Sequence, residues 1–388
     1  MNVKKKVYAM AMNLTSEFEN STVLNSTEIQ PSAWSLSEFS LLSFTLCLIL
    51  IIVLGVVGNF LVIYVQIRTT LNRGPTSTID VYIFHLSVAD FLFLLFCVPF
   101  QGTVYIFNNW PYGLALCKVA YFCQSVTMYA SIWFLTWMSV DRAVAIGYPL
   151  KSVKWRTVEL ATKMSIAVWT VSILLSTPYL MLYTTISYPE STVCYDDWPP
   201  DMYEYRRWSI LFVFFLTFAL PTVIIFCMAV LVCCAIQSSV QEPLLRTESC
   251  AGHHTDTRPL HRRRRRRVVW LVFALSVVQL VCWCPHSVTL VWLNFDRSAW
   301  EWVEDHSWTY FVMNILNHMG TYLHSCVNPV LYSLASEQFR VRLVHAFRGE
   351  RRSPNGSMTV SCYNTGAQAA TTTTTPHLVA KKNSKTPL

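Results

Sequence analysis

Long apolar stretches alternate with short polar ones along most of this chain. Seven of them contain at least 20 residues each, and a helix of that length can cross the ~30 Å hydrocarbon core of a membrane. Any single stretch could instead be a buried helix of a soluble protein, but seven in one chain favour a membrane protein. The predicted spans are Leu41–Ile67, Val81–Tyr105, Val119–Val140, Met164–Pro189, Trp208–Gln241, Val268–Phe295 and Ser307–Ser336. We therefore predict an all-α membrane protein with a bundle of seven transmembrane helices.

The third span has no charged residue from Val119 to Val140, and Asp141 and Arg142 follow it at once. Cys117 lies at its other end, about 37 Å from Arg142 along a helix that rises ~1.5 Å per residue. This segment therefore places a cysteine on one side of the membrane and a charge pair on the other. A helix of this kind can carry a signal between the two faces.

The composition supports the membrane interpretation and adds an orientation. Only 13% of the 388 residues are charged and 53% are hydrophobic, whereas a soluble domain has about 25% charged residues. Lys and Arg beside the spans are concentrated on one side, which includes the run Arg262–Arg267. Loops rich in Lys and Arg stay in the cytoplasm, where they also attract anionic lipid headgroups. We therefore predict a multi-pass plasma-membrane protein with an extracellular N-terminus and a cytoplasmic C-terminus.

The two ends of the chain differ in composition from its centre. Residues 1–37 are predicted to be a flexible extracellular tail, glycosylated at three N-x-[ST] sequons. The sequons begin at Asn13, Asn20 and Asn25. No apolar segment follows Lys4–Lys6, so we expect no cleaved signal peptide. Residues 349–388 are rich in Ser and Thr and are predicted to be a disordered cytoplasmic tail open to phosphorylation. Residues 38–348 hold the seven spans and a short amphipathic eighth helix, expected on the inner membrane surface.

This topology predicts which cysteines form a disulfide and which stay reduced. Of thirteen, only Cys117 and Cys194 fall on the outer side, where disulfides persist, so these two are predicted to pair. Four others are predicted to be cytoplasmic and reduced, and those near the membrane are candidates for lipidation. These four are Cys233, Cys234, Cys250 and Cys362.

Asp90 is the only carboxylate inside the seven spans. A charge there costs at least ~2.5–3.5 kcal/mol, so the side chain should face the bundle and have partners. One interpretation is a structural hydrogen-bond hub with Asn59 and Asn328, and the other is an ion or proton site. The outer loops 190–204 and 296–305 are acidic, which suits either attraction of a cationic ligand or an ordinary solvated surface.

Residues 38–348 resemble a rhodopsin-like (class A) G-protein-coupled receptor. The matching marks are Asn59, Asp90, the Cys117–Cys194 pair, Asp141-Arg142, Trp169, Pro221, CWCP at 282–285 and NPVLY at 328–332. Within this family the chain is most similar to the galanin receptors. The segments that carry this similarity are PFQGTVY (99–105), LCKVAYF (116–122), TMYAS (127–131), DRAVAIGYPL (141–150), TVCYDDWPP (192–200), CWCPHS (282–287), His318 and SCVNPVLY (325–332). Kisspeptin and allatostatin receptors stay as alternatives, and Gln124 is more like the kisspeptin receptor.

The resemblance implies that the chain is a neuropeptide receptor and not an enzyme. The receptor would activate a heterotrimeric G protein, with Gi/o as the expected class and Gq as the alternative. Arg142 would meet the G-protein α subunit and Leu150 would pack into it. The implied ligand contacts are Gln124, Trp198, Trp283, His286, Phe295, Phe311 and His318. The implied switch and ion pocket consists of Asn59, Asp90, Ser131, His324, Asn328 and Tyr332. Further expected partners are membrane lipids and an arrestin on the phosphorylated tail, and no nucleic acid is expected.

Several positions depart from the family pattern. Ala143 and Ala229 each replace a usual tyrosine, and Gln279 replaces a usual phenylalanine. His324 replaces a usual asparagine, and Ser287 replaces a second pocket histidine. Because His324 replaces an asparagine that helps to bind sodium near Asp90, we expect it to stabilise the Asp90 charge directly. We accordingly expect no cofactor, no metal site and no bound sodium ion.

Two other protein classes were weighed. A transporter would show internal repeats or several intramembrane charges, and this chain has Asp90 alone and no visible repeat. An intramembrane enzyme would need a nucleophile and base or a metal cluster. His286, His318 and His324 are not in an HExxH pattern, and such histidines more often form hydrogen bonds in a pocket.

Overall fold

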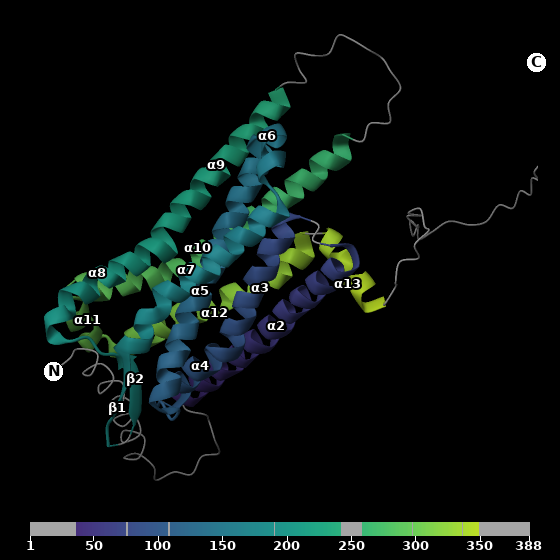
Figure 1. Cartoon of the computed structure of the whole chain (residues 1–388). Coiled ribbons are helices and arrows are strands. Elements are labelled where there is room, and N and C mark those ends of the chain that lie inside the picture. The colour runs from purple at the N-terminus through teal and green to yellow at the C-terminus, as the bar shows by residue number, and fades with distance from the viewer. Residues whose placement is uncertain are drawn as a thin grey trace, which may run out of the picture. The chain divides into compact units, whose positions relative to one another are not determined.

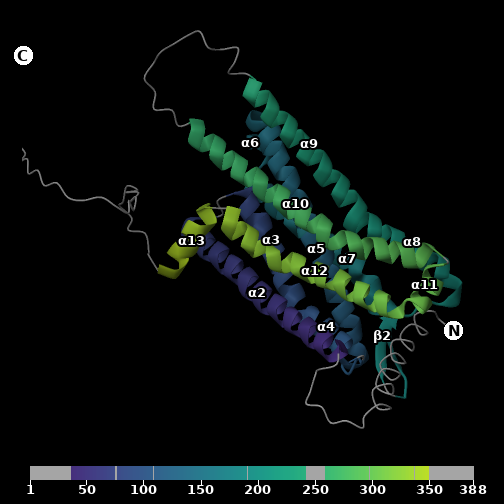
Figure 2. The same cartoon turned by 180° about the vertical axis from the view of Figure 1, so that it is seen from behind.

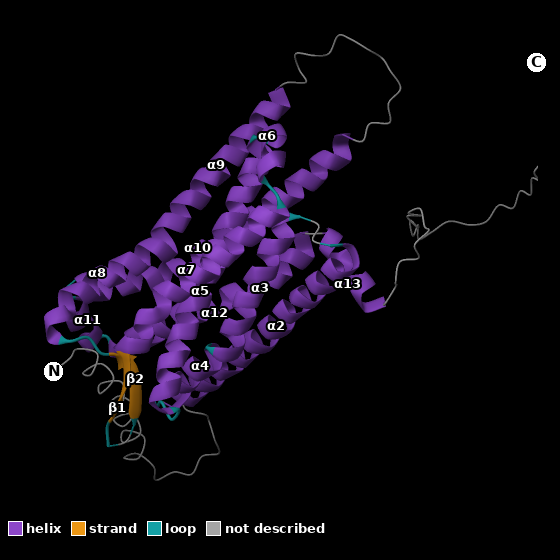
Figure 3. Cartoon of the chain, viewed as in Figure 1, coloured by secondary structure: helices purple, strands orange, loops and turns teal. Residues whose placement is uncertain are grey.

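The computed structural model describes residues 36–74, 77–107, 109–189, 191–241, 258–296, 298–335 and 337–348. The predicted glycosylation sites and the predicted tail 349–388 lie outside these residues, as do Cys250 and Cys362. Helices make up most of the described chain, and its one sheet is a two-stranded hairpin (Figure 3). The all-α prediction is therefore confirmed.

The helices are α2 (Leu36–Arg73), α3 (Thr78–Phe96), α4 (Val98–Phe107), α5 (Gly113–Gly147), α6 (Pro149–Trp155), α7 (Val158–Leu182), α8 (Tyr203–Phe214), α9 (Leu220–Gln241), α10 (Arg258–Phe295), α11 (Ala299–Asp305), α12 (Ser307–Ala335) and α13 (Glu337–Arg348). The strands are β1 (Tyr183–Ser187) and β2 (Thr192–Asp196). A 3-10 turn (Pro200–Met202) precedes α8, and a π-helical turn (Phe215–Ala219) joins α8 to α9.

Helix α5 lies at the centre of the bundle. It packs against α3, α7 and α9 (Figure 1), and contacts between α2 and α3, α2 and α12, and α10 and α12 join the other long helices (Figure 2). The β1–β2 hairpin lies at one end of the bundle, and α6 and α13 lie at the other (Figure 1). The third predicted span is thus the helix that most of the others contact.

Five segments of the described chain are long and apolar enough to cross a membrane. They are Leu41–Asn72, Thr78–Phe107, Val158–Leu182, Pro200–Ala235 and Phe273–Phe295. Helices α5 and α12 are not among them because both carry polar side chains, and many of these side chains are buried in the bundle. A helix that is shielded from lipid by its neighbours does not need an apolar surface on every side.

Three predicted spans differ in detail from the structure. The helix predicted over Met164–Pro189 ends at Leu182, because Tyr183–Ser187 pairs antiparallel with Thr192–Asp196. The span Val81–Tyr105 is interrupted at Cys97, because Pro99 has no N–H to donate to the carbonyl of Leu95 and its ring crowds that carbonyl. The span Trp208–Gln241 contains the π-helical turn, which lies just before Pro221, a residue with no N–H for the helix ladder.

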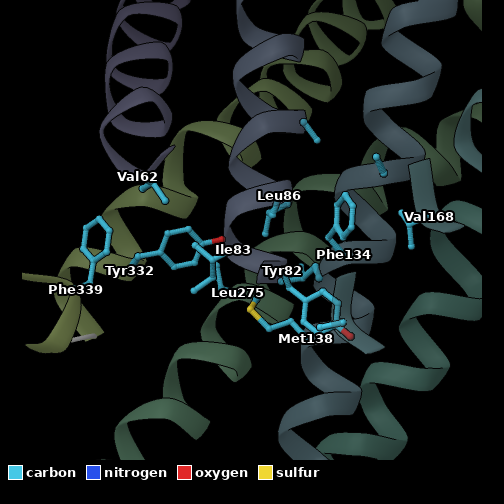
Figure 4. Close-up of a cluster of buried hydrophobic side chains, with 14 of the residues drawn as sticks. Val62, Tyr82, Ile83, Leu86, Phe134, Met138, Val168, Leu275, Tyr332 and Phe339 are labelled. Atoms are coloured by element: carbon cyan, nitrogen blue, oxygen red, sulfur yellow. The ribbon is translucent and has the colours of Figure 1, made fainter. Parts of the chain in front are cut away.

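A cluster of buried side chains fills the half of the bundle nearest α6 and α13. Tyr82, Phe134, Met138, Leu275 and Tyr332 bring α3, α5, α10 and α12 together there (Figure 4). Phe339 of α13 joins the same cluster, and the predicted amphipathic segment is thus a helix whose apolar face meets the bundle. Its position on a membrane surface stays a prediction.

Candidate functional site

The hairpin is fixed over one end of the bundle by covalent and polar contacts. Cys194 of β2 forms the predicted disulfide with Cys117 of α5. The backbone N–H of Trp110 donates to the carbonyl of Thr192 at 2.7 Å, and the Thr192 N–H donates to Asn109 Oδ1 at 2.8 Å. The hairpin therefore cannot move independently of the start of α5.

Beside the hairpin, Asp196 accepts a hydrogen bond from Trp198 Nε1 at 3.1 Å and pairs with Arg206 Nε at 3.0 Å. Arg206 also donates to Asn294 Oδ1 at 2.9 Å, which ties the hairpin to the end of α10. Asp196 belongs to the acidic outer loop 190–204, and Arg206 follows this loop in sequence. In the structure they pair, and the pair fixes the indole of Trp198, an implied ligand contact.

Below the hairpin, five aromatic rings from α4, α10 and α12 follow one another into the bundle. From the hairpin end inward they belong to Tyr105, His318, His286, Trp283 and His324; we call them the aromatic series. Successive ring centroids are 5.4, 5.4, 6.2 and 6.3 Å apart. The structure thus brings together three of the implied ligand contacts.

The upper end of the aromatic series is held by hydrogen bonds. His318 Nδ1 lies 2.8 Å from the carbonyl oxygen of Asn314 and 2.9 Å from the hydroxyl of Tyr105. Because a carbonyl oxygen only accepts, the contact with Asn314 favours the tautomer with the proton on Nδ1. This tautomer leaves His318 Nε2 as an acceptor. Tyr105 and Asn314 were not named as site residues from the sequence, although Tyr105 belongs to the PFQGTVY segment.

The other implied ligand contacts lie apart from this series. Gln124 of α5 is half-buried and accepts from Gln101 Nε2 at 3.1 Å. The guanidinium carbon of Arg207 lies 5.0 Å from the ring centre of Phe295, and the ring of Phe311 is 5.7 Å from that of Trp308. These contacts place Phe295 and Phe311 with residues near the helix ends rather than with the histidines.

Asp90 is fully buried and accepts three hydrogen bonds. Its Oδ1 accepts from Ser131 Oγ at 3.0 Å and from Ser325 Oγ at 2.8 Å, and its Oδ2 accepts from Asn328 Nδ2 at 2.7 Å. Asn59 joins this group indirectly, since its Nδ2 donates to the backbone carbonyl of Ser325 at 2.9 Å. The geometry is that of the predicted hydrogen-bond hub, with Asn59 one bond further away.

A small cavity connects the hub with the lower end of the aromatic series. Its ≈ 10 Å³ accommodates about one water-sized particle, and its lining includes Asp90, Ser131, Trp283 and His324. His324 thus lies near Asp90, as expected, but the three described hydrogen bonds to Asp90 do not include one from this imidazole. Among the described residues, His324 Nε2 has no hydrogen-bond partner although it is buried.

At the opposite end of α5, Asp141 has more partners than the sequence suggested. Arg142 Nε donates to Asp141 Oδ2 at 3.1 Å, Arg156 Nε donates to Oδ1 at 2.9 Å, and Thr78 Oγ1 donates to Oδ1 at 2.8 Å. Burial raises the pKa of this carboxyl, which lies just beyond the span Val119–Val140. The hydrogen bonds and charges of Arg156 and Arg142 outweigh burial and hold its pKa below the ordinary value.

The two implied G-protein contacts differ in accessibility. Arg142 is 17% exposed and is bound to Asp141, whereas Leu150 on α6 is 90% exposed. Asp141 and Arg156 hold α6 close to α5, because Arg156 directly follows α6. Sequence reasoning missed Arg156 and Thr78, since nothing in their local pattern indicates a partner 15 or 63 residues away.

Comparison with known proteins agrees with this arrangement. The model of the family "7 transmembrane receptor (rhodopsin family)" matches residues 58–332, and the chain belongs to this family. Galanin receptor 2b of Danio rerio is 33% identical over 300 residues, which cover 75% of this chain and 71% of that protein. Galanin receptor type 2 of Homo sapiens is 32% identical over 291 residues, 75% of this chain and 69% of that protein. Somatostatin receptor type 3 of Mus musculus is 30% identical over 328 residues, 84% and 73% of the two chains.

Family membership establishes the coarse function. The protein is a rhodopsin-family membrane receptor with galanin receptors among its relatives, and it is not an enzyme. The somatostatin receptor is nearly as similar as the galanin receptors, so overall identity alone does not select a ligand.

Proposed function

We propose that this receptor binds an extracellular galanin-like neuropeptide and activates a heterotrimeric G protein. The expected class of G protein is Gi/o, and Gq is the alternative. In this proposal the N-terminus is extracellular and the C-terminus is cytoplasmic. The peptide enters beside the hairpin and contacts residues of the candidate site. The proposed contacts are Gln124, Trp198, Trp283, His286, Phe295, Phe311 and His318.

The aromatic series is the observation that carries this proposal. It runs from Tyr105 of α4 to His324 in the Asp90 cavity, with successive centroids within 6.3 Å. Trp283 and His286 belong to α10 on either side of Pro285, which is inside the helix and removes one backbone hydrogen bond. A peptide that moves these rings can therefore favour a second bend of α10 by population shift.

The end of the bundle that carries α6 suits a protein partner. Leu150, Val153 and Trp155 of α6 are all more than 70% exposed. Leu150 would pack into the G-protein α subunit, and Arg142 would leave Asp141 to meet it. Phosphorylation of the segment 349–388 would add an arrestin contact, and the arginines near α10 would attract anionic lipids.

The test is G-protein activation in cells that express the chain, measured with galanin, kisspeptin and allatostatin-like peptides. We expect a response to galanin that is lost in Arg142→Ala. Lys163→Ala is the matched control, because Lys163 is an exposed cation on α7 at the same end of the bundle. A response to kisspeptin or to an allatostatin-like peptide, without a response to galanin, would identify that peptide class as the ligand instead. A galanin response that survived in Arg142→Ala would contradict the proposed role of Arg142.

The site also bears on ion binding. We propose that His324 takes the place of a sodium ion beside Asp90, even though the two side chains are not hydrogen-bonded. Support comes from the small cavity that both side chains line, because it places the imidazole beside the carboxylate. No cofactor is proposed.

A further inference from the structure

Two adjacent cysteines, Cys233 and Cys234, are exposed on α9. Free cysteine is among the residue types most often buried. Five of the nine free cysteines in the described chain are exposed, and among these five only Cys233 and Cys234 are adjacent. The residue before them, Val232, is 8% exposed and belongs to a cluster with Ala143 and Ile146 of α5. Successive side chains in a helix point about 100° apart, so the two cysteines point away from α5.

The same cluster fixes the depth of the cysteines. Ala143 and Ile146 follow Arg142, beyond the uncharged segment Val119–Val140. From Trp208 in α8 to Cys233 the helix advances about 37 Å, which exceeds the ~30 Å hydrocarbon core. Both measures place Cys233 and Cys234 at the boundary of the membrane, on the side of the bundle where α6 lies.

The neighbouring surface of α9 suits contact with lipid. Val230 and Leu231, on the turn before the cysteines, are 45% and 46% exposed. Cys227 is also exposed on α9, but it lies about 9 Å further into the membrane along the helix. Helix α9 thus contains an exposed cysteine pair at the boundary and an exposed cysteine in the hydrocarbon layer.

We propose that Cys233 and Cys234 are S-acylated by long-chain fatty acids. The Cys sulfur attacks the thioester carbonyl of a long-chain acyl-coenzyme A, and a new thioester bond forms between the acyl carbon and Sγ. The bond from the acyl carbon to the coenzyme A sulfur breaks, and the cysteine proton ends on the coenzyme A thiol. The exchange involves no net oxidation, and a membrane acyltransferase of the cell catalyses it.

The acyl chain enters the adjacent leaflet and anchors this end of α9. Helix α13, at the same end of the bundle, contains no cysteine, so α9 rather than α13 carries this anchor. The proposal rests on the cytoplasmic placement of this end given under Proposed function, since acyl-coenzyme A is a cytoplasmic substrate. It does not depend on the peptide or on the G protein.

The test uses the full chain with an N-terminal epitope tag and with Cys250→Ser and Cys362→Ser, so that neither of those cysteines contributes. Free thiols in cell membranes are blocked with N-ethylmaleimide, thioesters are cleaved with neutral hydroxylamine, and new thiols receive a polyethylene glycol maleimide. We expect a hydroxylamine-dependent mass shift, which is lost in Cys233→Ser/Cys234→Ser and kept in Cys227→Ser. Each single variant, Cys233→Ser or Cys234→Ser, should keep one polyethylene glycol group.

Two results would overturn the acylation. One is the absence of a shift while an antibody reaches the tag on intact cells, and the other is an unchanged shift in the double variant. Antibody access to the tag only after permeabilisation would instead refute the proposed orientation, and with it the acylation. Surface labelling of the double variant shows whether loss of the shift reflects loss of the folded receptor.

Discussion

At the scale of single residues, Asp141 has two arginine partners rather than one. Arg142 and Arg156 both donate to its carboxylate, and Thr78 adds a third donor. In the proposed coupling, Asp141 would still be paired with Arg156 when Arg142 leaves to meet a G protein. A buried carboxylate without a partner is costly, so Arg156 lowers the free energy needed to release Arg142.

Arg156→Gln should therefore weaken signalling without weakening peptide binding. A hydrogen bond to a charged group contributes about 1.5–3 kcal/mol, and part of that loss should lower G-protein activation by roughly three- to tenfold. Peptide affinity, measured by radioligand binding in the absence of G protein, should stay unchanged. Lys154→Gln on α6 is the control, since Lys154 is exposed. If Arg156→Gln lowered peptide binding as much as G-protein activation, Arg156 would only support folding.

His324 provides a second prediction at this scale. His324→Asn should create sodium sensitivity, because the smaller side chain enlarges the cavity beside Asp90 and supplies an oxygen ligand. We expect agonist affinity to fall about fivefold or more with Na⁺ in the variant, with little change in the unsubstituted receptor. N-methyl-D-glucamine at the same concentration controls for ionic strength. Steep sodium dependence before the substitution would contradict the proposal that His324 replaces the ion.

At the scale of helices, the contact between α10 and α12 depends on Gly320. A Cβ atom at this position would lie 3.0 Å from the backbone carbonyl oxygen of Cys282, next to Trp283 in the aromatic series. Backbone at this distance cannot move aside as a flexible side chain can. The close approach therefore sets how tightly α12 packs beside the bend of α10 at Pro285.

Gly320→Ala should force the two helices apart and reduce stability by about 1–3 kcal/mol, as overpacking usually does. The change should appear as a lower apparent melting temperature of the purified receptor in detergent. Gly147→Ala is the matched control, because a Cβ there meets no atom within 4 Å. If both variants melted alike, the α10–α12 contact would be looser than the structure shows.

At the scale of the whole molecule, α5 connects the two ends of the bundle, and the aromatic series extends from Tyr105 to the Asp90 cavity. The hairpin is bonded to one end of α5, and Asp141 lies near the other. If these ends are coupled, a peptide that favours G-protein binding must itself bind more tightly when the G protein is present.

Removal of the G protein with a non-hydrolysable GTP analogue should therefore lower peptide affinity by about 5- to 150-fold, the usual range of such coupling. Competition binding on cell membranes measures this shift. Arg142→Ala should have low affinity with and without the analogue, because it cannot engage the G protein. A shift of the same size in Arg142→Ala would show that the coupling bypasses this residue.

Much of the architecture follows from the chain itself. Membrane spans are determined by length and polarity over about 20 consecutive residues, and the disulfide was inferred from the sides on which two cysteines fall. The corrections concern local backbone at Cys97, at the turn before Pro221 and at the strand after Leu182. There, proline geometry and pairing with a distant segment override helical periodicity.

The sequence by itself determined the class of fold, the disulfide and the polar residues that lie inside the bundle. Only the tertiary structure decided which of them meet: Arg156 with Asp141, Arg206 with Asp196, and Tyr105 with His318. Hydrophobic patterning is a property of neighbours along the chain and fixes where each helix lies in the membrane. Contacts between side chains on different helices depend on the rotation and spacing of those helices, which packing sets and local sequence does not encode.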